Sequence, residues 1–256
     1  MKNVLITGAS RGIGRAIALK MAESGNDLFL NSLCKNGTDR LEAVKAEIDA
    51  LRVQRKIPGK TYTVPCDVGD PADVRRMFED IAGILREHHA DSDGIDILIN
   101  NAGISYIGLI QDMTEEEWNR IVSVNLSSVH YCSRAVIPHM LAAGEGRILN
   151  ISSVWGNVGA SCEVAYSATK GGMNAYTKAL AKELAPSNIA VNAIACGCID
   201  TDMNRHFDDD EREALCNEIP AGRFAKPEEV ADLAAAICSG STYLTGQVIS
   251  FDGGWT

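Results

Sequence analysis

Short apolar runs alternate with longer amphipathic stretches along the whole chain. The runs are rich in Val, Ile and Leu with few polar interruptions, which is typical of strands buried on both faces of a parallel sheet. Seven strands are predicted, at Val4–Thr7, Leu28–Asn31, Thr61–Pro65, Ile95–Ile99, Arg147–Ile151, Ala190–Ile194 and Gln247–Ser250. Between them the pattern predicts helices near residues 12–24, 38–52, 71–88, 115–141, 165–185 and 227–238.

This alternation of strands and helices predicts the fold class. Because crossover connections between parallel strands are right-handed, we expect one doubly wound (Rossmann) α/β domain over residues 1–256. Its parallel sheet would have about seven strands, with helices on both faces. Asp70-Pro71 and Lys226-Pro227 are expected helix starts, since proline suits the first helical turn.

Two stretches interrupt the alternation of predicted strands and helices. Residues 54–60 are basic and contain Pro and Gly, which predicts a surface turn. Residues 197–225 carry the acidic run Asp208–Glu211, which is typical of a solvated helix start. Because this segment follows the end of a strand, it also suits a mobile flap over a pocket.

Composition removes several classes of function. The net charge of −10 argues against nucleic acid or an anionic membrane surface as a partner, because both bind clustered Lys and Arg. No segment reaches the ~20 apolar residues of a transmembrane helix, and the apolar N-terminal run has no cleavage-site pattern. The eight cysteines form no CxxC pair, and Cys196-Gly197-Cys198 lacks the partners of a zinc site, so no metal is expected. We therefore expect a protein of the reducing cytoplasm.

A glycine turn, Gly8-Ala9-Ser10-Arg11-Gly12-Ile13-Gly14, joins the first strand to the first helix. Glycines at such a junction allow a pyrophosphate to approach the helix N-terminus closely, which predicts a dinucleotide site. The spacing is GxxxGxG rather than GxGxxG, and a strand–helix junction can use glycines for its turn alone. Because this turn lies at the start of the alternating strands and helices, a dinucleotide site is favoured over a purely structural turn.

The residues after the second strand bear on the choice of dinucleotide. An acidic side chain there would bind the adenosine ribose and repel a 2′-phosphate. The corresponding position holds Ser32, within Asn31-Ser32-Leu33-Cys34-Lys35, and no carboxylate. Arg11 and Lys35 are available to a 2′-phosphate, so NADP(H) is favoured over NAD(H).

Candidate chemistry follows three later strands. Tyr166 and Lys170 are four residues apart at a predicted helix start, so both project from one face. Ser153 lies thirteen residues before Tyr166, just past the end of a predicted strand, where open α/β sheets bind their ligands. The segment Asn100–Gly103 follows the fourth strand, and Asn125 lies within the next helix.

Together these motifs resemble the short-chain dehydrogenase/reductase family, in the branch of the β-ketoacyl-acyl-carrier-protein reductases. The matching features run from end to end: TGASRGIG at 7–14, Asp67-Val68, NNAG at 100–103, Asn125, Ser153, YSATK at 166–170, Ile199–Met203 and Asp252-Gly253-Gly254. The resemblance implies an enzyme that interconverts a ketone and a secondary alcohol with a nicotinamide cofactor.

The resemblance also implies roles for the catalytic candidates. Tyr166 would donate a proton to the carbonyl oxygen, Ser153 would orient the carbonyl, and Asn125 would hold a water in a relay to Lys170. Lys170 would also bind the nicotinamide ribose. An ammonium ~4 Å away is worth roughly 4 kcal/mol at an effective dielectric of about 20. We therefore expect Lys170 to lower the pKa of Tyr166 by about three units, to near 7.

Cofactor contacts follow from the same resemblance. The phosphates would meet Gly8, Ser10, Arg11, Gly12, Ile13 and Gly14. The remaining contacts would be Ser32 at the adenosine ribose, Asp67 and Val68 at the adenine, Asn101 in the ribose region, Tyr166 and Lys170 near the nicotinamide, and Ile199 at its amide. Val68 and Ile199 are also explained as core residues.

Two departures from the family pattern affect the interpretation. Cys196-Gly197 stands where Pro-Gly is usual, and a redox role for Cys196 is an alternative to simple packing. Residues 142–145 and 185–188 lack the basic side chains on which such reductases dock an acidic carrier protein. The substrate is therefore left open between a 3-oxoacyl carrier-protein conjugate and another ketone, such as a steroid, a sugar, a small metabolite or a modified protein side chain.

One rival belongs to another class. Some relatives of this fold bind the dinucleotide as sensors without turning it over, but such a protein has no use for Ser153, Tyr166 and Lys170. The family also implies a homotetramer, assembled through the long helices predicted at 115–141 and 165–185.

Overall fold

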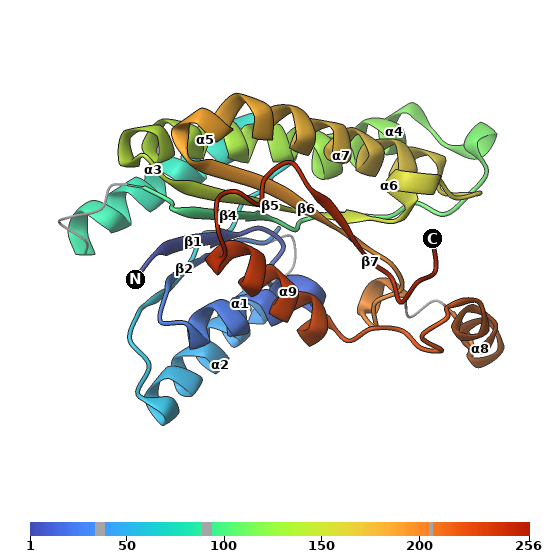
Figure 1. Ribbon diagram of the computed structural model, residues 1–256, viewed down its shortest axis with the longest axis horizontal. Helices are drawn as coiled ribbons and strands as arrows, with labels where there is room; N and C mark the ends of the chain where they lie inside the picture. The colour runs from blue at the N-terminus through green and yellow to red at the C-terminus, as the bar shows by residue number, and fades with distance from the viewer. Residues whose placement is uncertain (34–38, 89–93, 205–206) are drawn as a thin grey trace.

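The computed structural model describes residues 1–33, 39–88, 94–204 and 207–256. Within these ranges all strands belong to one parallel sheet of order β3-β2-β1-β4-β5-β6-β7 (Figure 1). The strands are β1 (Asn3–Ile6), β2 (Asp27–Leu30), β3 (Thr61–Thr63), β4 (Ile97–Asn100), β5 (Gly146–Ser153), β6 (Ile189–Cys196) and β7 (Val248–Phe251). The predicted doubly wound sheet is confirmed.

Helices cover both faces of the sheet (Figure 1). One face carries α1 (Gly12–Glu23), α2 (Asp39–Arg55) and α9 (Pro227–Ser239). The other carries α3 (Pro71–His88), α4 (Glu115–Val122), α5 (Ser128–Ala143) and α7 (Val164–Leu184). The predicted starts of α3 and α9 at proline are confirmed, and Asp70 accepts a hydrogen bond of 2.7 Å from the backbone N–H of Ala72.

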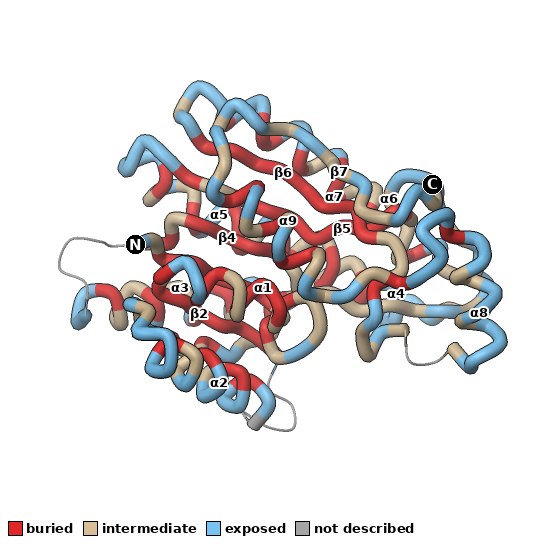
Figure 2. Tube along the Cα trace, turned by 60° about the horizontal axis from the view of Figure 1, so that its bottom comes forward, coloured by how far each residue is buried: buried red, intermediate tan, exposed pale blue. Residues whose placement is uncertain are grey.

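Each strand supplies side chains to two hydrophobic cores, because successive residues of a strand point to opposite faces. Val4 and Ile6 pack in the core beneath α1 and α9, whereas Leu5 packs with Phe29 in the core beneath α3, α5 and α7. Figure 2 shows the strands buried and the outer helix faces exposed. Burial on both faces explains why the strands are almost continuously apolar.

The helix predicted at 115–141 is not continuous. A π-helical turn, Ser123–Ser127, separates α4 from α5. The wider turn carries Asn125, which is fully buried and bonded to the backbone of Ile104 in the loop after β4. π-Helical turns are often found at functional sites, where they change the direction of a side chain. The apolar pattern on either side of this turn does not reveal it, so the sequence predicted one continuous helix.

Strands β5 and β6 extend further than predicted. Ser153 and Cys196 are therefore the last residues of these strands, paired with each other, and Ser153 does not lie beyond the strand end. A short helix, α6 (Trp155–Val158), follows β5 and was not predicted. The turn expected at 54–60 begins later, because α2 continues to Arg55.

The segment 197–225 contains two local elements in its described part. A 3₁₀ turn covers Asp202–Asn204, and α8 covers Asp209–Glu218. Asp208 caps α8 by accepting a hydrogen bond of 2.8 Å from the backbone N–H of Glu211, which confirms the helix start predicted from the acidic run. Both elements lie at the end of the molecule where the strands finish (Figure 1).

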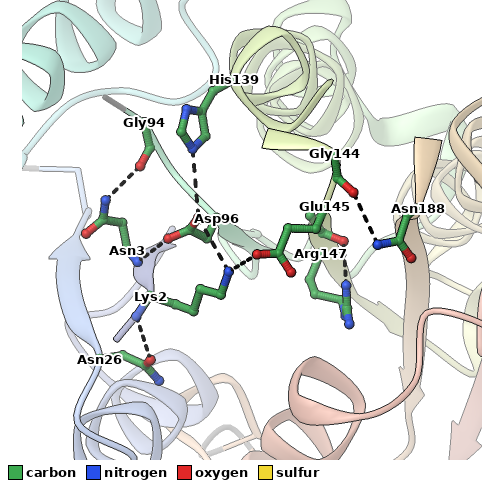
Figure 3. Close-up of polar contacts among 11 residues, drawn as sticks. Lys2, Asn3, Asn26, Gly94, Asp96, His139, Gly144, Glu145, Arg147 and Asn188 are labelled. Atoms are coloured by element: carbon green, nitrogen blue, oxygen red, sulfur yellow. Dashed lines mark hydrogen bonds and ion pairs between the residues drawn. The ribbon is translucent and has the colours of Figure 1, made fainter. Parts of the chain in front are cut away.

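At the opposite edge, where the strands begin, polar groups join neighbouring strands (Figure 3). Lys2 contacts Glu145 and lies 3.9 Å from Asp96, which accepts a hydrogen bond of 2.7 Å from the backbone N–H of Asn3. Asn188 donates to the carbonyl of Gly144 at 3.2 Å. In the described part of the chain, no helix is both long and apolar enough to cross a bilayer.

Candidate active site

A cavity of about 700 Å³ opens at the carboxyl ends of the strands. It lies beside β1 and β4, where the connections leave the sheet in opposite directions and a crevice forms. The glycine turn, Tyr166 and Lys170 all line this one cavity. Among the predicted site residues that the structure describes, Asn125 alone does not line the cavity. The predicted residues that line it are Gly8, Ser10, Arg11, Gly12, Ile13, Gly14, Ser32, Asp67, Val68, Asn101, Ser153, Tyr166, Lys170 and Ile199.

The glycine turn forms a cradle that fits a pyrophosphate. Gly8 has φ +67°, which an L-side chain rarely adopts, and a Cβ on Gly14 would lie 2.3 Å from the carbonyl oxygen of Gly8. Helix α1 begins at Gly12, and its N-cap residue Arg11 makes no side-chain capping bond. The first backbone N–H groups of α1 are therefore available to an anion, and the helix dipole favours one.

Asn101 braces this turn from the loop after β4. Its side-chain amide donates to the carbonyls of Thr7 and Gly8 at 2.9 and 3.0 Å. The hydroxyl of Thr7 in turn accepts from the backbone N–H groups of Asn101 and Ala102, both at 3.0 Å. Asn101 therefore fixes the position of the cradle relative to β4, in addition to lining the cavity.

The far end of the cavity is formed by the residues after β2. Ser32 is buried there, and Leu33 and Arg40 lie beside it on the cavity wall. Arg40, in the first turn of α2, was not predicted. Cys34 and Lys35, the latter a predicted contact for a 2′-phosphate, lie outside the described residues.

Two other charged groups of the predicted cofactor site have partners within the protein. Arg11 pairs with Asp202, on the segment after β6, at 3.1 Å. Asp67 pairs with Arg120 at 2.8 Å and accepts a hydrogen bond from the backbone N–H of Gly69. Their charges are therefore largely balanced locally, whereas Arg40, also on the cavity wall, forms no ion pair within the described part of the chain.

Helix α7 and strand β5 bring the catalytic candidates together. The ammonium nitrogen of Lys170 donates to the carbonyl of Ile151 at 2.8 Å and lies 5.5 Å from the centre of the Tyr166 ring. A hydrogen bond joins the side chains of Tyr166 and Ser153. The neighbouring Ser152 donates instead to the side chain of Asn174 at 2.6 Å, because adjacent residues of a strand face opposite ways.

The electrostatics differ from the expectation. Burial raises the pKa of Tyr166, the neighbouring Cys196 and Glu163 raise it further, and the hydrogen bond with Ser153 only partly opposes them. Burial also lowers the pKa of Lys170 to about 8. The predicted lowering of the tyrosine pKa by Lys170 is therefore wrong for this structure, because the cost of burying the phenolate exceeds the attraction of a lysine that is itself desolvated.

Asn125 clamps the loop after β4. Its carbonyl accepts from the backbone N–H of Ile104 and its amide donates to the Ile104 carbonyl, both at 2.8 Å, with Thr169 at 3.3 Å. These contacts position the loop that carries Gly103 toward Lys170. The water relay to Lys170 that the resemblance implies for Asn125 stays a prediction.

Cys196 is buried at the end of β6, and burial raises the pKa of its thiol to about 12. The thiolate is the reactive form of cysteine, so this thiol is inert at neutral pH. Packing as a small apolar side chain explains Cys196 better than a redox role does.

Several lining residues were missed by the sequence reasoning. Trp155 and Trp255 place their rings 4.8 Å apart at the cavity. Trp255 directly follows the motif Asp252-Gly253-Gly254, but that motif gives no sign of a contact with Trp155. Glu163 stands three residues before Tyr166, so the helix period could have identified it. Ser105, Ile107, Cys198, Met203, Phe207 and Leu215 complete this wall.

The two segments that were expected to dock a carrier lie elsewhere. Residues 142–145 and 185–188 precede β5 and β6, at the edge of the sheet where strands begin (Figure 3). The cavity lies at the edge where strands end. Their lack of basic side chains therefore gives no information about docking at the cavity of the same subunit.

Comparisons with known proteins agree with this geometry. A family model described as "Enoyl-(Acyl carrier protein) reductase" matches residues 8–256. The chain is 39% identical over 251 residues to 3-oxoacyl-[acyl-carrier-protein] reductase FabG of Aquifex aeolicus, covering 98% of this chain and 95% of that protein.

Solved structures are similar over the whole chain. A short-chain type dehydrogenase/reductase from Mycobacterium marinum has a TM-score of 0.87 and 34% identity, covering 100% of this chain and 95% of that one. A 3-oxoacyl-[acyl-carrier protein] reductase from Brucella melitensis has a TM-score of 0.88 and 33% identity, covering 100% of this chain and 91% of that one.

Burial of Lys170 predicts a stability cost that depends on pH. Below pH 8 the folded protein holds a buried cation, whereas the unfolded chain keeps this lysine protonated up to about pH 10.5. The lowered pKa corresponds to a cost of about 3 kcal/mol for holding this cation buried in the folded protein. A methionine would remove this cost but would also lose the hydrogen bond to Ile151, which is worth about 1 kcal/mol. Lys170→Met should therefore raise the free energy of unfolding by about 2 kcal/mol at pH 7, and the gain should vanish as the pH rises from 8 toward 10.5.

Urea unfolding at pH 7 and at pH 9.5 measures this difference. Lys178→Met, at an exposed position of the same helix, is the matched control and should show no such pH dependence. A Lys170→Met protein that is less stable than the unmodified protein at pH 7 would contradict the prediction.

Proposed function

The chain belongs to the short-chain dehydrogenase/reductase family and is an oxidoreductase that uses a nicotinamide cofactor, and we propose that it is an NADP(H)-dependent reductase of 3-oxoacyl thioesters, of the 3-oxoacyl-acyl-carrier-protein reductase type. The observation that carries this proposal is the single cavity shared by the glycine cradle and the hydrogen-bonded pair of Ser153 and Tyr166. A bound dinucleotide would supply the hydride that reduces the carbonyl carbon.

The chain's own residues would handle the proton and the oxygen. With its raised pKa, Tyr166 keeps its proton at neutral pH and gives it to the developing alkoxide, which is a much stronger base than a phenolate. Ser153 donates to the same oxygen and supports its negative charge. Lys170, held by the Ile151 carbonyl, lies beside the tyrosine ring, where its ammonium favours phenolate after the transfer.

The acyl thioester is favoured over other ketones by two kinds of support. The names of similar proteins point to the 3-oxoacyl group, and Ser153 and Tyr166 form a pair of hydroxyls suited to a carbonyl oxygen rather than to a carbon–carbon double bond. The wall formed by Trp155, Trp255 and Leu215 suits an apolar acyl chain. An acyl-carrier protein would be the partner that presents this chain.

NADP(H) is favoured by the residues at the ribose end. Ser32 and Leu33 offer no carboxylate to repel a 2′-phosphate, and Arg40 lines the wall beside them. A guanidinium binds phosphate well because its planar fork can donate two hydrogen bonds at once. Arg11, the other candidate, is engaged with Asp202.

Assembly and location complete the proposal. We expect a homotetramer that pairs the faces of α4, α5 and α7, on which Trp118, Leu141 and Val164 are exposed. The described cysteines are free thiols, which suits a cytoplasmic protein.

Tyr166→Phe removes the proposed proton donor and leaves the ring in place. Its turnover of acetoacetyl thioester with NADPH, followed by absorbance, should fall by about 10²–10⁴-fold. Affinity for NADPH, measured by fluorescence titration, should change less than threefold, because the cradle is untouched. Absence of turnover by the unmodified protein across thioesters and free ketones would instead favour a dinucleotide sensor.

Arg40→Ala tests the cofactor preference. Loss of one guanidinium–phosphate contact should lower kcat/KM for NADPH by about tenfold, which is about 1.4 kcal/mol, and leave the value for NADH nearly unchanged. Arg75→Ala, on the exposed face of α3 and outside the cavity lining, is the matched control. Equal losses with NADPH and NADH would contradict the assignment.

The oligomeric state is measured by light scattering. We expect four times the chain mass of 27.4 kDa. A monomeric mass at micromolar concentration would exclude the tetramer and leave the catalytic proposal standing.

A further inference from the structure

The C-terminal tail, residues 252–256, follows β7 and brings a tryptophan to the cavity. Trp255 lines the wall, and the centre of its ring lies 4.8 Å from that of Trp155 at the start of α6. Figure 1 shows the C-terminus at the end of the molecule that carries α8. Both tryptophans are partly buried, so each packs against the other and still reaches the cavity. The tail therefore supplies part of the wall of the proposed substrate site.

Asp252 holds this tail in a tight turn. Its carboxylate accepts hydrogen bonds from the backbone N–H groups of Gly254 and Thr256, both at 3.0 Å, and from the hydroxyl of Thr256 at 2.9 Å. Burial opposes the charged form, but these hydrogen bonds outweigh it and hold the pKa of Asp252 below its usual value. Because the bonds reach the residues on both sides of Trp255, they fix where its side chain leaves the backbone.

A second contact joins the tail to the segment after α8. Gly253, at φ +70°, accepts a hydrogen bond of 3.1 Å from the backbone N–H of Ala221. A Cβ on Gly253 would lie 2.9 Å from side-chain atoms of both Ile219 and Ala221, so the close packing here requires glycine. Leu215, near the end of α8, lines the same cavity. The tail and the end of α8 are thereby held together as one wall.

The tryptophan pair lies next to the catalytic hydroxyls. The backbone N–H of Trp155 donates to Oγ of Ser153 at 3.2 Å, and Ser153 is hydrogen-bonded to Tyr166. A ketone held by these two hydroxyls would therefore have its first carbons near Trp155. Trp255 extends this wall by a second ring. The combined apolar surface exceeds what the single methyl group of an acetoacetyl substrate can cover, because one tryptophan side chain alone can bury about 150–250 Å².

We propose that Trp255 is a specificity-determining residue that makes the enzyme prefer longer 3-oxoacyl chains to the acetoacetyl group, and that Asp252 is the positioning residue that holds it on the cavity wall. This inference rests on the proposed reduction of a 3-oxoacyl group. Each methylene group that leaves water for an apolar surface favours binding, and two such groups correspond to about tenfold in affinity. The other substituent of the ketone leads to a polar carrier, so the two rings suit the alkyl end.

The experiment compares the N-acetylcysteamine thioesters of 3-oxobutanoate and 3-oxooctanoate as substrates, with NADPH, in the full chain. For the unmodified enzyme, kcat/KM should be higher for the longer substrate. Trp255→Ala should lower the ratio of the two values by about tenfold, because the longer chain loses an aromatic surface that the shorter one does not cover. Trp255→Phe keeps a ring at this position and should retain most of the preference.

Asp252→Ala tests the positioning role. It should lower the same ratio, and combining it with Trp255→Ala should lower the ratio no further, because both changes act through one side chain. Effects that simply add would contradict this role. Tyr243→Ala removes an aromatic ring that is 96% exposed and outside the cavity lining, so it is the matched control and should leave the ratio unchanged. Affinity for NADPH reports whether each variant keeps its fold.

Binding without turnover distinguishes this inference from the proposed function. Calorimetric titration of the two thioesters into protein loaded with NADP⁺ measures affinity where no hydride is available. If both thioesters are reduced and Trp255→Ala leaves their ratio unchanged, the inference fails while the function stands. If neither is reduced but the longer one binds more tightly, and Trp255→Ala removes this difference, the function fails and the chain selection stands. If neither is reduced and affinity does not depend on chain length, both are overturned.

Discussion

The hydrogen bonds between Asn101 and the end of β1 hold the two halves of the site in register. Strands β1 and β4 are neighbours, but their connections leave the sheet in opposite directions, so no helix or turn links the loops that follow them. The Asn101 amide closes this gap by donating to Thr7 and Gly8. Because a Cβ on Gly14 would collide with the same Gly8 carbonyl, cradle and brace depend on one close approach of backbone. The cofactor cradle is thereby fixed relative to the loop that Asn125 clamps next to Lys170.

The catalytic side chains need a site from which water is excluded, and the burial that excludes water also costs free energy. The same burial that lowers the pKa of Lys170 to about 8 raises the pKa of Tyr166. A tyrosine that keeps its proton at neutral pH can act as a proton donor. The bond between Lys170 and the Ile151 carbonyl offsets part of the cost, because a carbonyl dipole stabilises a cation without adding a second buried charge.

The fold was largely predictable because buried parallel strands leave an uninterrupted apolar pattern, and proline and aspartate mark helix starts such as Pro71 and Asp208. The site was predictable where a motif has a fixed spacing along one helix, as Tyr166 and Lys170 do. It was not predictable where contacts join distant segments. Nothing in the sequence near Trp255 shows that it meets Trp155, and nothing near Arg11 shows that it pairs with Asp202. The direction of the tyrosine pKa was mistaken because a charge pair can be inferred from spacing, whereas the depth of burial that opposes it cannot.

The net charge of −10 is a poor guide to what this cavity binds. At physiological salt, charges separated by more than about 8 Å are largely screened in water, so carboxylates on distant surfaces act weakly on a ligand in the site. What a ligand meets is the local set: the open N-terminus of α1, Arg40 at the ribose end, and two carboxylates already paired with arginines. An acidic protein can therefore offer a dinucleotide a favourable end, formed by the N-terminus of α1 and by Arg40. The total charge of the chain conceals this local polarity.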